Sequence, residues 1–227
     1  MKKETGALSN KNLLLDEIQV ACEKFNLDPL KRIAKSVRNF ACQDKYLDVA
    51  VLGHFKAGKS SFLNSYLGSK ILPVGNLPVT SVITRITYGE EENGVVTFLD
   101  GSSQKIPIKD VHGFVSESEN PENRKNVLVV DISTACMHRI KGLRLVDTPG
   151  IGSIWKHNTQ TTTEWFPETA AALFLISAEK PISESEMDLL EEVFRYSPKT
   201  FLVITKTDLH TEEQIREIES FTAGAVK

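Results

Sequence analysis

The sequence has few cysteines, no long apolar run and no excess of positive charge, and each absence excludes a class of protein. Its three cysteines, Cys22, Cys42 and Cys136, form no C-x-x-C pair, so we expect reduced structural thiols and no disulfide framework, zinc site or thiol nucleophile. No run approaches the roughly 18 apolar residues of a membrane helix, and the polar start lacks an apolar signal core. A net charge of −3 offers no basic field, so no nucleic acid is expected as a partner. A cytoplasmic protein is predicted.

What is present fits one α/β core. The 227 residues are 41% hydrophobic and 25% charged, which is typical of a globular domain. Apolar segments alternate with helical patterns, and this predicts a doubly wound, mostly parallel sheet flanked by helices and joined by right-handed crossovers. The expected strands lie near residues 47–52, 82–88, 127–133, 143–147, 171–177 and 200–205. The expected helices of this core are residues 60–68, 183–196 and 212–221.

Two regions stand outside this alternation. Polar breaks at residues 90–93 and 116–125 predict a surface insertion over 89–126, with a hairpin around Asp100-Gly101. Before the first strand come amphipathic segments at 13–25 and 29–40. We therefore divide the chain into an N-terminal helical segment, residues 1–45, and a nucleotide-binding domain, residues 46–227.

A complete phosphate-binding motif follows the first strand. Residues 53–60 read G-H-F-K-A-G-K-S, between an apolar strand and a helix. Backbone N–H groups of such a turn and of the following helix bind phosphate oxygens. Lys59 would reach the β- and γ-phosphates and Ser60 would bind Mg²⁺, as in other phosphate loops. The residues expected to contact nucleotide here are Gly53, Phe55, Lys56, Ala57, Gly58, Lys59, Ser60 and Ser61.

Two further strands end in motifs that complete such a site. Thr205-Lys206-Thr207-Asp208 is a [N/T]-K-x-D pattern, in which the Asp208 carboxylate accepts hydrogen bonds from guanine N1–H and N2–H₂ and the Lys206 stem covers the ring. Adenine lacks that donor pair, so guanine is favoured. Residues 147–150 read D-T-P-G, where Asp147 would hold Mg²⁺ through water and the Gly150 N–H would meet the γ-phosphate. Thr205, Lys206, Asp208, Asp147 and Gly150 join the predicted nucleotide site.

Hydrolysis also requires a threonine that reaches Mg²⁺ and the attacking water. Thr80 is our choice, and Thr84 is a weaker one, because residues 82–87 alternate as a strand and we expect their threonines on a solvated face. The predicted metal ligands are Ser60, Thr80 and Asp147. The predicted catalytic residues are Lys56, Lys59 and Thr80.

Together the motif GxFKAGKSSFLNxxLG, the Pro78-Val79-Thr80 segment, DTPG and TKTD resemble the GTPase domain of the dynamin superfamily, particularly its bacterial branch, from about residue 46 to about residue 208. The resemblance implies GTP hydrolysis with Mg²⁺, activated when two GTPase domains dimerise. It also implies membrane remodelling by the full-length protein, at the inner face of the membrane, with lipid bound through regions outside this chain. The residue 1–45 segment would join a helical neck.

Within this resemblance, the position of the water-orienting glutamine of Ras-like enzymes is occupied by Ile151. Lys56 stands where guanylate-binding proteins of the same superfamily carry an internal arginine finger. Two interpretations of Lys56 remain open, a catalytic cation and a solvated loop lysine.

Few residues follow Asp208, too few for the last strand, the guanine-supporting loop and the final helix of such a domain. We therefore expect a C-terminally incomplete domain with uncovered apolar surface and marginal stability. Two alternative functions also stay open. One is an Era-like, ribosome- or RNA-associated GTPase, and the other is a nucleotide-binding remnant that does not hydrolyse.

Overall fold

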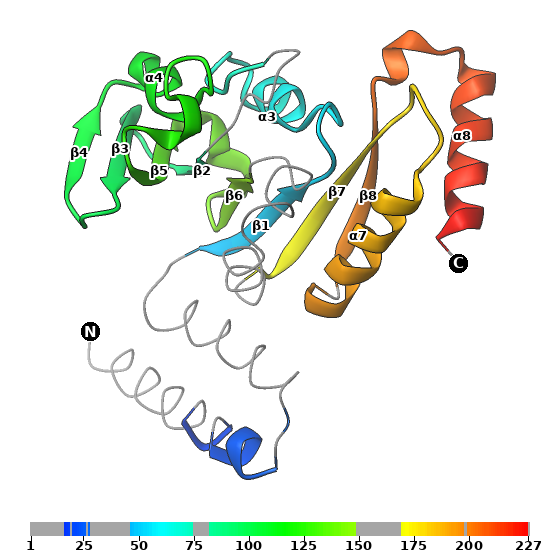
Figure 1. The fold of residues 1–227 in the computed structure, drawn as a ribbon, viewed down its shortest axis with the longest axis horizontal. Coiled ribbons are helices and arrows are strands. Elements are labelled where there is room, and N and C mark those ends of the chain that lie inside the picture. Colours follow the sequence, from blue (N-terminus) through cyan, green and yellow to red (C-terminus); the bar gives the residue numbers. More distant parts are fainter. Residues whose placement is uncertain are drawn as a thin grey trace.

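The computed structural model describes residues 16–18, 20–25, 27, 46–74, 82–148, 169–197 and 199–226. These residues form a mixed eight-stranded sheet in the order β4-β3-β5-β2-β6-β1-β7-β8, with helices packed against it (Figure 1). The strands are β1 Leu47–Leu52, β2 Ile83–Tyr88, β3 Asn93–Phe98, β4 Ser103–Ile106, β5 Val127–Thr134, β6 Leu143–Asp147, β7 Ala171–Ser177 and β8 Thr200–Thr205. The α-helices are α3 Lys59–Leu67, α4 His112–Val115, α7 Glu184–Tyr196 and α8 Glu212–Ala225. Short 3₁₀ turns are η1 Ile108–Asp110, η2 Pro121–Asn123, η3 Ala135–Ile140 and η5 Thr207–Leu209.

The centre of the sheet is parallel and brings the predicted motifs to one edge. Strands β6, β1, β7 and β8 run in the same direction as hydrogen-bonded neighbours. Their carboxyl ends therefore meet at one edge, where the phosphate loop, Asp147 and the TKTD segment all begin. The predicted α/β P-loop fold is confirmed, and the predicted strand positions agree closely with those observed.

The rest of the sheet is not a continuation of this parallel pattern. Strand β2 runs antiparallel to β6, so its first residues lie beside the last residues of β6, with Thr84 opposite Asp147. Beyond β2, β5 runs parallel to β2, and β3 and β4 form an antiparallel hairpin. Alternation in the sequence predicts a strand but not the direction in which it runs. Because β2 is antiparallel to β6, the first residues of β2 lie at the candidate site.

The predicted surface insertion at 89–126 is partly wrong. The hairpin is present, with Gly101 in its turn, but β3 pairs with β5 and so extends the main sheet. Side chains of this region are buried in the core, including Val96, Ile106, Val111 and Val115. The apolar side chains of β3, η1 and α4 are removed from water by packing in the same cluster as α3, on one face of the sheet.

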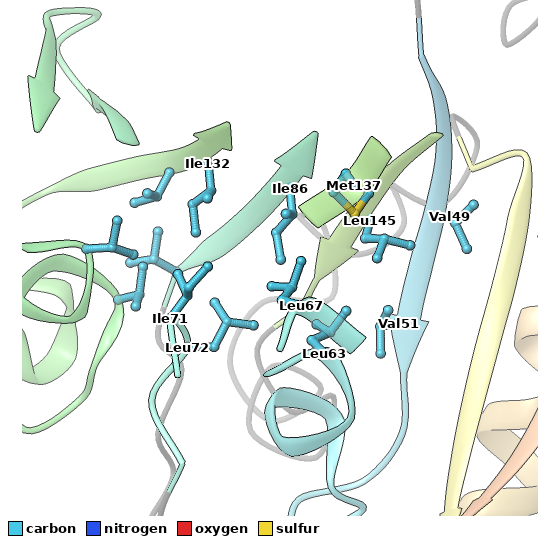
Figure 2. Packing of buried hydrophobic residues seen from close by; sticks show 14 of the residues in the cluster. Val49, Val51, Leu63, Leu67, Ile71, Leu72, Ile86, Ile132, Met137 and Leu145 are labelled. Atoms are coloured by element: carbon cyan, nitrogen blue, oxygen red, sulfur yellow. The ribbon is translucent and has the colours of Figure 1, made fainter. Parts of the chain in front are cut away.

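Two apolar clusters cover the two faces of the sheet. Figure 2 shows the larger cluster, in which Leu63 and Leu67 of α3 face Val51, Leu145 and Ile86 of the sheet. The smaller cluster lies on the other face, where Leu189, Leu190 and Val193 of α7 pack on Leu52 and its neighbours in β1 and β7. The central strands are thus buried from both sides, as expected for a parallel sheet.

The helices begin and end at residues that satisfy their free backbone groups. Helix α7 begins with a capping box in which the Ser183 N–H donates to Glu186 Oε2 at 2.9 Å, and α8 has the same arrangement between Thr211 and Gln214. Helix α3 ends at Leu67 and is capped by Gly68, whose N–H points to the carbonyls of Asn64 and Ser65.

The N-terminal segment is described only in part. Residues 16–18 and 20–24 are helical, within the first predicted amphipathic segment. The second predicted segment, 29–40, lies outside the described residues, so both the neck and the domain boundary at residue 45 stay predictions. Among the helices that the structure describes, none is long and apolar enough to cross a membrane.

Candidate nucleotide-binding site

The phosphate loop is held tightly between β1 and β7. Strand β1 is buried along Ala50–Leu52, and the loop leaves it at Gly53, whose φ is 145°. A Cβ at Gly53 would lie 2.6 Å from the carbonyl oxygen of Leu175, so only glycine fits this close approach. Gly58 precedes α3 in the left-handed region at φ 85°. The loop therefore reaches α3 with the N-terminus of that helix facing the carboxyl edge of the sheet.

Lys59 closes the loop from inside. Its Nζ donates to the carbonyl oxygens of Gly53 at 2.9 Å and His54 at 3.2 Å. Burial lowers the pKa of Lys59, and the nearby Asp147 opposes that shift. The lysine is thus placed at the centre of the turn, where phosphate oxygens would compete for its ammonium group.

Asp147 ends β6 with a fully buried carboxylate. Oδ2 accepts a 3.4 Å hydrogen bond from Ser60 Oγ, while Oδ1 has no hydrogen-bond partner among the described residues. Burial raises the pKa of Asp147 to about 6, and Lys59 and Ser60 counter part of that rise. Thr148 Oγ1 donates to the Val51 carbonyl at 3.1 Å and ties the ends of β6 and β1 together. A buried carboxylate with an unused oxygen beside a hydroxyl is a donor set that suits Mg²⁺.

Protein side chains alone would not complete the coordination of such an ion. No group of three or more His, Cys, Asp or Glu side chains suited to a metal occurs in the part of the chain that the structure describes. Ser60 and Asp147 leave positions for phosphate oxygens and water, which is the usual situation of nucleotide-bound Mg²⁺. The two residues fit the predicted ion.

The TKTD segment meets the phosphate loop through its first threonine. Thr205 Oγ1 lies 2.7 Å from the Ala57 carbonyl and 3.2 Å from the Ile176 carbonyl, and its one proton can serve either. Thr205 also lines the space beside Gly58. The sequence places Thr205 in the predicted nucleotide site without a specific task, and its hydrogen bond to Ala57 shows that it connects the TKTD segment to the phosphate loop.

Lys206 and Asp208 follow where the strand has ended. Lys206 is in the left-handed region at φ 59°, and its Nζ forms an ion pair with Glu179. Asp208 lies in η5 with an exposed carboxylate. Glu179 was not expected from the sequence, and hydrogen bonding to Lys206 holds its pKa below its usual range. Its position two residues after β7, at the same sheet edge, is the signal that could have found it.

Three predicted loop residues are exposed. Lys56 has φ 66° and its Nζ lies 5.7 Å from the centre of the Phe55 ring, which is itself 40% exposed. Ser61 is exposed on the first turn of α3. These side chains face away from the core, on the outside of the phosphate loop.

The structure does not describe every predicted site residue. Thr80, Gly150 and Ile151 lie outside the described residues, so their predicted roles are untested. Thr84 is described, and the expectation of a solvated threonine face is wrong. Its side chain is 0% exposed, on the buried face of β2 with Ile86, whereas Thr87 lies on the opposite face. Thr84 is therefore no candidate for a loop that closes over nucleotide.

The fold and these residues define a class. The class is that of P-loop nucleotide-binding domains of the GTPase type. Its features here are a glycine-rich loop before α3, a buried aspartate at a strand end beside the Ser60 hydroxyl, and a TKTD segment hydrogen-bonded to that loop.

Comparison with known proteins gives the family. The sequence profile of the dynamin family matches residues 49–207, and the chain belongs to this family. It is 36% identical over 212 residues to an uncharacterized protein in the xynA 3′ region of Caldicellulosiruptor sp., covering 93% of this chain and 52% of that protein. It is 24% identical over 252 residues to dynamin-like protein 1 of Campylobacter jejuni, covering 94% and 34% respectively.

A solved structure supports the fold. It is described as an oligomerised bacterial dynamin pair that provides a mechanism for long-range sensing and tethering of membranes. The chain aligns to it with a TM-score of 0.64 at 23% identity, covering 87% of this chain and 31% of that one. The chain thus spans about half the length, or less, of these relatives.

Proposed function

We propose that this chain binds Mg²⁺·GTP and hydrolyses it to GDP and phosphate. The observation that carries the proposal is the convergence at one sheet edge of Lys59, the Ser60–Asp147 pair and the Thr205–Asp208 segment, with Thr205 hydrogen-bonded to the phosphate loop. Phosphoryl transfer depends mainly on positioning and charge stabilisation, and this arrangement offers both. Family membership supports the same activity.

Each part of the proposed site has a separate task. Lys59 would exchange its two carbonyl partners for β- and γ-phosphate oxygens, and the N–H groups at the start of α3 would bind the same anions. Ser60, Asp147 and Thr80 would hold Mg²⁺, which supplies positive charge against the phosphates when it is bound.

Asp208 would select guanine, the Lys206 stem would cover the ring, and the Gly150 N–H would contact the γ-phosphate.

Few side chains are available to orient the attacking water, because the side chain of Ile151 cannot form hydrogen bonds. We assign it to Thr80 and to groups completed when two domains meet. Lys56 would add a cation at the phosphates in that dimer, and its exposed position on the outer side of the loop supports such a role. A published dynamin assembly among the similar structures is oligomerised, which supports self-association here as well.

GTP turnover measured against protein concentration tests the proposal. Specific activity should rise with concentration, because the dimer completes the site. Lys59→Ala should abolish turnover, and Lys56→Ala should lower the high-concentration rate by about tenfold or more. Lys70→Ala, an exposed lysine beyond α3, is the matched control and should retain the wild-type rate.

Two results would contradict parts of this account. Unchanged turnover in Lys56→Ala at high concentration would make that residue a solvated loop lysine. Nucleotide binding with flat, near-zero turnover at every concentration would make the chain a binding remnant.

The longer protein is proposed to remodel membranes, working at the cytoplasmic face with lipid bound outside this chain. The description of the similar bacterial pair, which tethers membranes, supports this role. Co-sedimentation of the full-length protein with anionic liposomes, with and without GTP, tests it. Binding to RNA in place of liposomes would instead favour a ribosome-associated GTPase.

A further inference from the structure

Two buried side-chain oxygen atoms, on directly paired residues of β2 and β6, have no hydrogen-bond partner within the described part of the chain. Thr84 is 0% exposed and its Oγ1 has no hydrogen-bond partner among the described residues. Asp147 is also 0% exposed, and its Oδ1 is unpartnered within the same part of the chain. The two residues are direct register partners of the antiparallel β2–β6 pair. Buried polar atoms normally have partners, so two such atoms in one place require an explanation.

Strand geometry brings the two side chains together. Directly opposed residues of an antiparallel pair point to the same face, with Cβ atoms about 4.5–5.5 Å apart. Thr84 Oγ1 is one bond from its Cβ, and Asp147 Oδ1 is two bonds from its own. A small rotation of either side chain, or one bridging water molecule, would close the remaining gap.

The two neighbours of Asp147 approach it from opposite sides. Strand β6 lies between β1 and β2 in the sheet. Ser60, in the first turn of α3 after β1, donates to Oδ2. Thr84 comes from β2, on the other side, and its side chain lies on the same sheet face as that of Asp147. The carboxylate can thus be held at both oxygens, one by each neighbouring strand.

A purely structural threonine on the same strand behaves differently. Thr87 lies on the opposite face of β2, and its hydroxyl donates to the Ile132 carbonyl at 3.3 Å. Thr84 makes no such backbone hydrogen bond among the described residues, and its neighbours on this face, such as Val82 and Ile86, are apolar. Valine would satisfy packing here equally well, so the hydroxyl itself needs a role.

We propose that Thr84 is a positioning residue of the Mg²⁺ site, whose hydroxyl donates to Oδ1 of Asp147 directly or through one water and so keeps Oδ2 turned toward the ion beside Ser60. It does not touch the ion or nucleotide, unlike the role assigned to Thr80. The inference rests on the proposed Mg²⁺–nucleotide site. Groups that orient metal ligands in this way commonly change metal affinity by 10–100-fold when removed.

Fluorescent GDP binding, titrated with Mg²⁺ and repeated in EDTA, tests the inference without any need for turnover. Thr84→Val removes the hydroxyl and keeps the shape, and it should raise the half-saturating Mg²⁺ concentration by about tenfold while GDP affinity in EDTA stays within about twofold of wild type. Thr84→Ser keeps the hydroxyl and should restore Mg²⁺ dependence to within about threefold. Thr87→Val is the control on the opposite face and should leave Mg²⁺ dependence unchanged.

The outcomes separate this inference from the proposed function. If wild-type protein binds GDP with no dependence on Mg²⁺, the proposed site itself is wrong. If wild type depends on Mg²⁺ and Thr84→Val gives the same titration, only the role of Thr84 is overturned. Equal loss of GDP affinity in EDTA and in Mg²⁺ would also overturn it, because the residue would then serve packing alone. Thr84→Ala deletes the same hydroxyl and decides the matter by the same criteria if Thr84→Val folds poorly.

Discussion

Asp147 shows how burial and charge compete at a single residue. Removal from water favours the neutral carboxyl group, whereas Lys59 and Ser60 favour the ionised one, and the net effect raises the pKa to about 6. The ionised carboxylate, which is the form that would bind Mg²⁺, is therefore less favourable in the folded protein than in water. A divalent cation beside the carboxylate would reverse the balance.

This balance predicts how stability of the nucleotide-free protein depends on pH. The folded-state pKa lies above the ordinary value of 3.8, so the folded protein binds the proton more tightly and loses stability as pH rises from about 4 to about 6. The loss is at most about 3 kcal/mol. The Asp147→Asn side chain cannot ionise, so its contribution to stability should not change with pH. The free energy of unfolding of the variant should therefore rise relative to that of wild type as pH increases over this range.

Urea unfolding in EDTA at several pH values, with both proteins, measures this difference. Asp188→Asn makes the same chemical change on an exposed side chain of α7 and serves as the control. A constant difference between wild type and Asp147→Asn from pH 4 to pH 7 would show that burial does not control this carboxyl group.

At the scale of elements, the site depends on contacts between loops that follow different strands. Thr205 at the end of β8 holds the carbonyl of Ala57 in the phosphate loop, and Gly58 packs against the same side chain. The segments proposed to bind base and phosphate are therefore connected in the nucleotide-free protein, which would lower the entropic cost of ordering them on binding.

Thr205→Val should separate these two loops. Loss of the hydroxyl leaves the Ala57 carbonyl without its donor and should cost about 1 kcal/mol of unfolding free energy. GDP affinity should fall about tenfold, the equivalent of ~1.4 kcal/mol. Thr200→Val is the matched control, because Thr200 donates to the Ser197 carbonyl at 2.8 Å from the far end of the same strand. It should lose similar stability and keep GDP affinity. Equal affinity in the two variants would rule out the coupling.

At the scale of the whole molecule, the sequence predicts strands and motifs better than it predicts which way strands run. The strands of the parallel centre can be predicted from the sequence, because each is a short apolar run followed by polar or motif residues. β3 and β4 were expected only as a surface hairpin, since β4 is mostly polar, reading Ser-Gln-Lys-Ile. The direction of β2 and the buried face of Thr84 depend on pairing with β6, and local alternation does not encode that pairing.

One of the two edges of the described sheet lies at β8. Among the described strands β8 pairs only with β7, and large apolar side chains nearby are exposed: Phe201, Leu209 and Phe221 are 59%, 60% and 59% exposed. Figure 1 shows α8 beside this edge. Our expectation of marginal stability stays a prediction. Size-exclusion chromatography with urea unfolding checks it, and monodisperse protein that unfolds cooperatively with ordinary stability would contradict it.

Binding of guanine nucleotide and Mg²⁺ at this sheet edge can be tested by comparing the affinities of wild type and Asp208→Asn for fluorescent GDP and fluorescent ADP. We expect wild type to bind GDP in a Mg²⁺-dependent way and to bind ADP at least about a hundredfold more weakly. Asp208→Asn should lose most of that preference, because the paired carboxylate provides the discrimination. Equal affinity of wild type for GDP and ADP, or no binding of either, would show that this edge is not a guanine-nucleotide site.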